Sequence, residues 1–359
     1  MKHRQLALKR ENVLNTDGHA IGIDIGATAV RAAVLAPGTV NGRPSVTVEG
    51  LGQVALPHGA VKDGVVHDGE VVTAALKQLW AEQKFNCRTV IVGVASPQAL
   101  VRDLQMPNLD PARRAKALPY QAKEVIAVPI DELVLDYCQI GEPHPDSDLV
   151  DGLLIATPRE PVLTAVEAVE RAGLRVARVD LSSFAALRAI GDQHLAVEAV
   201  VDLGAHLSTI VIHDRGVPKL VRTLARGGEQ LTEQLADRLG VERLEAEATK
   251  CAGGLESGHA EVTRALLEGL RPLIAEIRTS AAYFRSTHDD SPIERISLTG
   301  GGSRLVGIAD PIRDQVELPT RVVDPLQHIR DRERSESTIA GLMVPPSAVS
   351  VGLAMGAAA

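Results

Sequence analysis

The chain carries one pattern of apolar and polar positions twice: an apolar strand with an aspartate near its end, a glycine turn, and a second apolar strand. The first copy is IDIGATAVRAAVL at residues 23–35, and the second is VDLGAHLSTIVI at residues 201–212. β-Branched and apolar residues on both sides of each glycine predict strand, tight turn and strand. Because the same residue types recur in the same order, the pattern predicts a fold built from two similar halves.

Segments whose apolar positions have the spacing of a helix alternate with these strands. The segment EVVTAALKQLWAEQ at residues 70–83 places its apolar positions on one face of a helix. Pro161 predicts the start of a helix over residues 161–172. A long helix is expected from about residue 260 to residue 286, with an interruption near Pro272. The alternation of strands and helices predicts an α/β fold.

A third glycine cluster lies in ISLTGGGSRL at residues 296–305. It predicts a strand, a glycine turn and then a helix capped near Ser303, so bare backbone and unpaired N–H groups would meet a nucleotide or another anion. The sequence contains no GxxxxGK[ST], and Gly300, Gly302 and Leu305 break the GxGxxG spacing. The two commoner nucleotide-binding motifs are therefore excluded.

Length and charge narrow the function classes. A chain of 359 residues with 45% hydrophobic residues is long enough for two domains. A net charge of −8 and an aromatic content of 2% argue against a nucleic-acid partner, which needs positive charge and stacking platforms. The three cysteines form no CxxC pair, as is typical of a reducing compartment. We therefore expect a cytoplasmic protein.

Neither end of the chain indicates insertion into a membrane. The basic segment MKHRQLALKRENVL lacks the apolar core of about 7 to 15 residues that an export signal needs. Residues 337–359 carry no charge, but Pro345 and Pro346 interrupt them. We expect a helix packed inside the protein at this end.

Asp24 and Asp202 each precede one of the repeated glycine turns. A buried carboxylate is unfavourable unless a cation or hydrogen-bond donors face it. Two such hairpins would place backbone N–H groups around a polyphosphate from two sides, with both carboxylates near a hydrated Mg²⁺ ion. In the alternative interpretation, each aspartate only caps its own turn.

The order of DIGATAV, DLGAHLST and TGGGSRL resembles the actin-like ATPase superfamily, and residues 20–358 are similar to the PilM family of type IV pilus assembly proteins, which is related to the division protein FtsA. Residues 106–141, MPNLDPARRAKALPYQAKEVIAVPIDELVLDYCQIG, are similar to the first part of the small subdomain inserted in that family. The resemblance implies an α/β fold of actin-like (ribonuclease H-like) duplicated domains with a small inserted α/β subdomain. The expected organisation is a basic leader at 1–19, the first actin-like domain at 20–96 and 181–195, the insert at 97–180, the second actin-like domain at 196–347, and a C-terminal helix at 348–359 that returns to the first domain.

The resemblance also implies ATP and Mg²⁺ as cofactors and assigns the residues that bind them. Asp24 and Asp202 would hold Mg²⁺ through water. Glu247 and Lys250 lie on one helical face, where the resemblance implies ribose and adenine contacts, although an ordinary surface pair has the same spacing. The nucleotide-binding residues are expected to be Asp24, Gly26, Ala27, Thr28, Arg31, Asp202, Gly204, Ala205, His206, Thr209, Gly228, Glu247, Lys250, Gly300, Gly301, Gly302 and Arg304.

Two departures from the family pattern bear on catalysis. Ala27 stands where the family usually carries serine, and Arg31 stands where it usually carries lysine. No residue is identified that would position water for hydrolysis. Asp180 precedes an expected N-cap at Ser182 or Ser183, and helix capping is the role that this position indicates. We expect ATP binding with at most slow hydrolysis, and the catalytic residues stay unknown. The eleven histidines form no HExxH motif and no cluster with cysteine that would indicate zinc.

The resemblance implies a cytoplasmic, ATP-binding scaffold of the type IV pilus platform at the inner membrane. Its implied partner is a PilN-like single-span membrane protein, whose cytoplasmic N-terminal peptide would dock near strands at 133–140 and 153–157 and recruit the chain to the membrane. A pilus motor ATPase is a second candidate partner. Two alternatives are an FtsA-like division protein, whose basic C-terminal membrane helix has no match after Glu336, and a sugar or acid kinase, whose asparagine-aspartate pair has no match.

Overall fold

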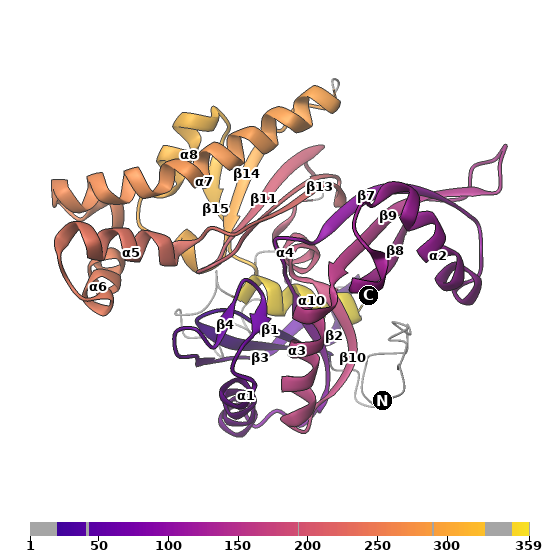
Figure 1. The fold of residues 1–359 in the computed structure, drawn as a ribbon, viewed down its shortest axis with the longest axis horizontal. Coiled ribbons are helices and arrows are strands. Elements are labelled where there is room, and N and C mark those ends of the chain that lie inside the picture. Colours follow the sequence, from indigo (N-terminus) through magenta and orange to yellow (C-terminus); the bar gives the residue numbers. More distant parts are fainter. Residues whose placement is uncertain (1–19, 41–42, 193, 289–290, 327–346, 359) are drawn as a thin grey trace.

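Two five-stranded sheets, one in each half of the chain, carry the fold (Figure 1). The computed structural model describes residues 20–40, 43–192, 194–288, 291–326 and 347–358. The leader at 1–19 and residues 327–346 of the expected second domain lie outside the described residues.

The first sheet has the strand order β10-β6-β1-β2-β3. β1 pairs antiparallel with β2 and parallel with β6, so the hairpin that carries Asp24 lies in the middle of the sheet. The strands of this sheet are β1 (Ala20–Ile25), β2 (Ala29–Val40), β3 (Arg43–Ala55), β6 (Thr89–Val94) and β10 (Arg175–Leu181).

The second sheet has the order β13-β12-β11-β14-β15 and repeats the same plan. β11 pairs antiparallel with β12 and parallel with β14, as β1 does with β2 and β6. The prediction of two similar halves is therefore confirmed. The strands of this sheet are β11 (Val197–Leu203), β12 (Ser208–Asp214), β13 (Val217–Leu224), β14 (Arg295–Thr299) and β15 (Thr320–Val322).

Helices pack against the two sheets, and most of them bury one apolar face in the core of their own half. α1 begins where the Asp68 side chain accepts a hydrogen bond from the Val71 N–H, at 3.0 Å. The helices are α1 (Gly69–Gln83), α3 (Arg159–Arg171) and α4 (Ser182–Ile190) in the first half, and α5 (Gly228–Leu239), α6 (Arg243–Gly253), α7 (Ala260–Thr287) and α8 (Ala309–Val316) in the second.

The expected interruption at Pro272 is wrong, because α7 is one helix of 28 residues. Leu270, Leu273, Ile274 and Ile277 are all buried on its inner face, on both sides of the proline. Packing of this stripe against the second core holds the helix together despite the hydrogen bond that proline cannot donate.

A small three-stranded sheet with the order β7-β9-β8 forms the inserted unit, which projects to one side of the molecule (Figure 1). One face of this sheet packs against α2, where Met106, Leu118, Tyr137 and Leu154 are buried together. The elements are β7 (Leu100–Pro107), α2 (Pro111–Val125), β8 (Leu133–Ile140) and β9 (Leu149–Pro158).

The insert ends earlier in the structure than the predicted boundary at residue 180. Val162, Ala165 and Val169 of α3 are buried in the core of the first domain, together with Leu76 of α1. β10 pairs in parallel with β6 and so belongs to the first sheet. The chain therefore re-enters the first domain directly after β9.

The last described helix, α10 (Ala348–Ala358), lies against β1 and α4 of the first domain (Figure 1). A Cβ atom on Gly22 of β1 would lie 2.2 Å from the Ser350 carbonyl oxygen, so glycine permits this close approach. Val351, Leu353 and Ala354 are fully buried there. Among the helices of the described ranges, none is both long enough and apolar enough to cross a bilayer.

Candidate functional site

The two halves face each other across a cleft with a volume of about 480 Å³. Every residue that the sequence predicted for nucleotide binding, from Asp24 to Arg304, lines this one cleft. The first hairpin, the second hairpin, the α5–α6 pair and the glycine cluster after β14 each contribute a part of the wall.

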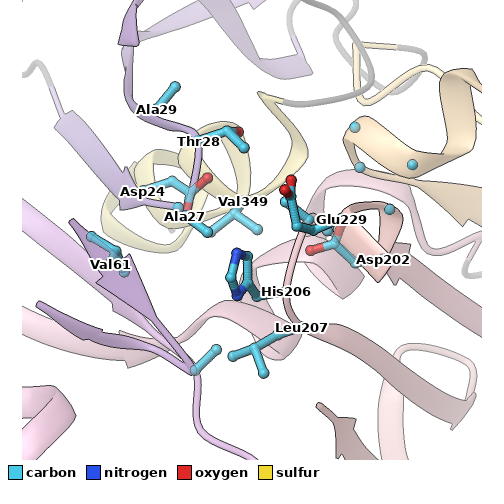
Figure 2. Close-up of a pocket in the computed structure, with 18 of the residues that line it drawn as sticks. Asp24, Ala27, Thr28, Ala29, Val61, Asp202, His206, Leu207, Glu229 and Val349 are labelled. Atoms are coloured by element: carbon cyan, nitrogen blue, oxygen red, sulfur yellow. The ribbon is translucent and has the colours of Figure 1, made fainter. Parts of the chain in front are cut away.

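Both glycine turns close with the same hydrogen bond. The Gly26 N–H donates to the Ala29 carbonyl and the Gly204 N–H donates to the Leu207 carbonyl, each at 3.0 Å. Figure 2 shows Asp24, Ala27 and Thr28 on one side of the pocket, Asp202 and Glu229 on the other, and the His206 ring between them. The matched turns therefore present their aspartates to the same space.

Strand register decides what faces each aspartate. Asp24 is paired with Arg31 across β1 and β2, and Asp202 is paired with Thr209 across β11 and β12. The Arg31 Nη1 atom lies 3.3 Å from Asp24 Oδ2, and both side chains are 15% exposed. Asp24 thus has a cationic partner, Arg31, whereas Asp202 lies opposite a residue with a hydroxyl group, Thr209.

The two carboxyl groups share a poorly solvated site. Burial raises the pKa of Asp24 above its usual range, although the Arg31 guanidinium opposes this shift. Burial, reinforced by the negative charge of Asp24, raises the pKa of Asp202 to about 7. A divalent cation near both carboxylates would relieve this repulsion.

Several features of the cleft fit a phosphorylated ligand with its cation. Thr209 Oγ1 and Arg31 Nε are buried and have no hydrogen-bond partner among the residues that the structure describes. Gly300 has a φ of 83°, and a Cβ atom there would lie 2.2 Å from Asp202 Oδ1. A Cβ atom on Gly301 would meet nothing within 4 Å, so its backbone borders open space.

Glu247 and Lys250 form a fixed pair on the wall of the cleft. The Lys250 ammonium lies 2.7 Å from Glu247 Oε2 and donates to the Gly228 carbonyl at 2.9 Å and to Thr232 Oγ1 at 2.7 Å. Burial alone would raise the pKa of Glu247, but hydrogen bonds from Lys250 and Thr232 lower it below its usual range. The Lys250 side chain is 11% exposed, so this is not an ordinary surface pair.

Two sequence-based expectations about helix starts are wrong. Gly301–Arg304 form a short 3₁₀ turn in which the Ser303 hydroxyl donates to the Gly300 carbonyl at 2.7 Å, and α8 begins only at residue 309. α4 has no side-chain cap, because its N-cap residue is Leu181, and Ser182 and Ser183 lie inside the helix. Asp180 instead forms an ion pair with Arg188 at 2.5 Å.

The sequence did not single out some residues that also line the cleft. Glu229 follows the glycine pair 227–228 in the first turn of α5, and Asp63 and Gly64 lie between β4 (Val61–Lys62) and β5 (Val65–Val66). The glycine pair was a usable signal for Glu229. The short hairpin at 61–66 has no motif, and only the fold brings it to the cleft.

Comparisons with known proteins agree over most of the chain. The family model described as type IV pilus assembly protein PilM matches residues 22–358. A chain of a solved PilM-PilN type IV pilus biogenesis complex is 26% identical with a TM-score of 0.78, and the match covers 95% of this chain and 98% of that chain. Cell division protein FtsA of Bacillus subtilis (strain 168) is 22% identical over 376 residues, covering 92% of this chain and 84% of the relative.

A more distant structure agrees in fold. MreB5 of Spiroplasma citri, solved with AMPPNP bound, is 13% identical with a TM-score of 0.54, and the match covers 94% of this chain and 95% of that chain. The predicted fold class, actin-like duplicated α/β domains, is confirmed by these similarities together with the repeated sheet plan.

Proposed function

Because the chain belongs to the family of the type IV pilus assembly protein PilM, we propose that it is a cytoplasmic scaffold of the pilus assembly platform that binds Mg·ATP in its interdomain cleft. The observation that carries the proposal is the matched pair of hairpins, whose aspartates face one cleft from its two sides. Two such turns can present backbone N–H groups and a shared cation site to one polyphosphate.

Each wall of the cleft has its own role in this proposal. The turn residues 27–28 and 205–206 would donate N–H groups to phosphate oxygens, since the Gly26 and Gly204 N–H groups already close the turns. Arg31 and Thr209 would find there the partners that their buried Nε and Oγ1 atoms lack. Glu247 and Lys250 would orient the ribose and adenine. Mg²⁺, when bound, supplies the positive charge that Asp24 and Asp202 require. The expected slow hydrolysis stays a prediction.

Mg·ATP at 100 times its Kd is expected to raise the free energy of unfolding by about 2.7 kcal/mol, because only the folded halves assemble the site. Melting curves with and without Mg²⁺ measure this effect. Asp24→Ala and Asp202→Ala should each remove the Mg²⁺-dependent part of this stabilisation. Asp103→Ala, an exposed aspartate on β7, serves as the control and should retain it. An unchanged shift in both cleft variants would refute the assignment.

A steric variant tests the same cleft without altering its charges. Gly301→Val adds a side chain where a Cβ atom meets nothing within 4 Å, so the nucleotide-free protein should melt within about 0.5 kcal/mol of the parent. The side chain should nevertheless compete with the ligand for space and weaken binding at least about tenfold in calorimetry. Full affinity in this variant would show that the ligand lies elsewhere.

We also propose that a PilN-like protein of the inner membrane recruits the chain through its cytoplasmic peptide. β8 is an edge strand of the insert, paired only with β9 among the described strands, so it can accept an added strand. Val134 and Ile140 of β8 pack toward the core of the first domain. A peptide added at this edge would therefore lie along the boundary between the insert and the first domain.

Two natural cysteines provide matched reporters for the two ligands. Cys138 is exposed on β8, and Cys251 is exposed and lines the cleft. A synthetic peptide with the PilN-like N-terminal sequence should slow alkylation of Cys138 and leave Cys251 unaffected, whereas Mg·ATP should do the reverse. Alkylation is followed by mass spectrometry. If the peptide protects both thiols equally, or protects neither of them, docking at β8 is contradicted.

The alternative of an FtsA-like division protein shares the fold, since Bacillus subtilis FtsA is 22% identical to the chain. The family match along residues 22–358 favours the pilus role. Binding of the PilN-like peptide separates the two, because a division protein has no reason to recognise it.

A further inference from the structure

Three side chains that the proposed nucleotide site leaves unassigned meet where the two domains approach each other. His58 lies in the segment after β3 of the first domain, and Glu229 and Glu233 lie one turn apart on α5 of the second. One ligand atom from each lies within 4.8 Å of the other two. We propose that these residues form a site for a divalent transition-metal ion of the zinc class that bridges the two domains.

The distances suit a metal better than a direct hydrogen bond. Tetrahedral zinc sites have bonds of about 2.0 to 2.2 Å to nitrogen and oxygen, which places neighbouring ligand atoms about 3.4 Å apart. His58 Nε2 lies 3.6 Å from Glu229 Oε1, beyond the range of a good hydrogen bond and close to this ligand separation. Glu233 is exposed, so rotation of its side chain can close the remaining gap.

The local charge also favours a cation. Carboxylates one helical turn apart repel each other, and the Glu229 side chain is only 8% exposed. Arg243 donates to Glu229 Oε1 at 2.9 Å, which balances one charge and orients the carboxylate as second-sphere partners of metal ligands do. After pairing with Arg243, the two glutamates together still carry one net negative charge. The His206 ring, 6.0 Å from that of His58, adds an imidazole beside the site.

The donor set distinguishes this site from the Mg²⁺ site proposed at Asp24 and Asp202. Imidazole with carboxylates suits zinc and related metals, whereas magnesium prefers oxygen ligands alone. Glu229 and His206 also line the nucleotide cleft, so a metal here would restrain the opening of the cleft at its edge. A zinc site here goes beyond the proposed nucleotide function, and its metal binding is measured without nucleotide.

The test titrates Zn²⁺ into the metal-free full chain by calorimetry. One equivalent should bind, and His58→Ala and Glu233→Gln should each weaken binding at least about tenfold. Glu229 is left intact because it also pairs with Arg243. His67→Ala and Glu261→Gln remove an exposed histidine and an exposed glutamate elsewhere and should bind as the parent does. Unchanged affinity in both cluster variants, or no stoichiometric binding by the parent, would overturn the proposal.

Hydrogen exchange tests the bridge itself. Zn²⁺ should slow exchange both at residues 56–60 in the first domain and at residues 228–235 in the second, and protection of α5 alone would overturn the bridging role. Asp202→Ala separates the two sites, because it should lose the Mg²⁺-dependent effect of ATP and retain Zn²⁺ binding. Loss of both in this variant would show that the zinc is bound by the nucleotide site and not by His58.

Discussion

Replacing Glu198 with alanine is expected to lower the free energy of unfolding by about 3–5 kcal/mol, because it removes the fully buried carboxylate around which a cationic and polar network is arranged. Glu198, on β11, is fully buried. Its carboxylate lies 3.1 Å from His213 Nε2 and accepts hydrogen bonds from the Asp192 N–H at 2.7 Å, from Arg295 Nη2 at 2.7 Å and from the Ser297 hydroxyl at 2.5 Å. Chemical denaturation of the variant against the parent measures the loss.

The same carboxylate makes stability depend on pH. Burial alone would raise the pKa of Glu198, but the hydrogen bonds, with that to His213 foremost, lower it from 4.5 to about 2. Because the pKa of Glu198 is lower in the folded state, its contribution to the free energy of unfolding is fully present above about pH 4.5 and is lost as the pH falls toward 2. The loss amounts to about 3 kcal/mol over that window.

Glu198→Gln should therefore show a flatter decline of stability between pH 5 and pH 2.5 than the parent. Glu261→Gln, at an exposed position of α7, provides the control and should decline as the parent does. An acid profile of Glu198→Gln that matches the parent would contradict the network's role. Because Glu198 and Asp202 lie at opposite ends of β11, the folded variant should still bind nucleotide, which separates folding from function.

Local patterns predicted much of the cleft. The order of aspartate, apolar residue and glycine determines a hairpin, and hairpin pairing alone brings Arg31 opposite Asp24 and Thr209 opposite Asp202. Because the two hairpins are equivalent in the duplicated fold, their aspartates meet. The duplicated architecture could therefore be predicted from short segments of sequence. The family resemblance assigned many of the residues that line the cleft, but not Glu229, Asp63 or Gly64.

The features that escaped prediction depend on contacts between distant segments. The sequence of α3 predicts a helix whether the segment belongs to the insert or to the first domain. Burial of residues such as Val169 in the core of the first domain assigns it there. Pro272 is tolerated because the inner face of α7 is buried on both sides of it. His58 and Glu229 carry no common motif, so their approach follows from domain packing alone.

Gly352→Ala is expected to destabilise the first domain by about 3 kcal/mol or more, because the added Cβ atom would lie 1.7 Å from the Ala185 carbonyl oxygen in α4. The Ala185 carbonyl belongs to the backbone of α4, so no side-chain rotation can relieve the clash. Gly356→Ala, in the same helix, is the matched control. The atoms nearest its Cβ, at 3.0 Å, would be side-chain atoms of Arg178 and Arg188 and not backbone, so a shift of a few tenths of an ångström suffices and the cost should be well below that of Gly352→Ala.

Urea unfolding of the two glycine variants measures this difference. Equal stability would show that α10 is not held at this depth between α4 and β1. The consequence should extend to the cleft, because α10 packs on the strand that carries Asp24 and its Val349 side chain lines the pocket. A Gly352→Ala protein that still folds should therefore bind Mg·ATP more weakly than Gly356→Ala, since displacing α10 removes both the support beneath β1 and part of the cleft wall.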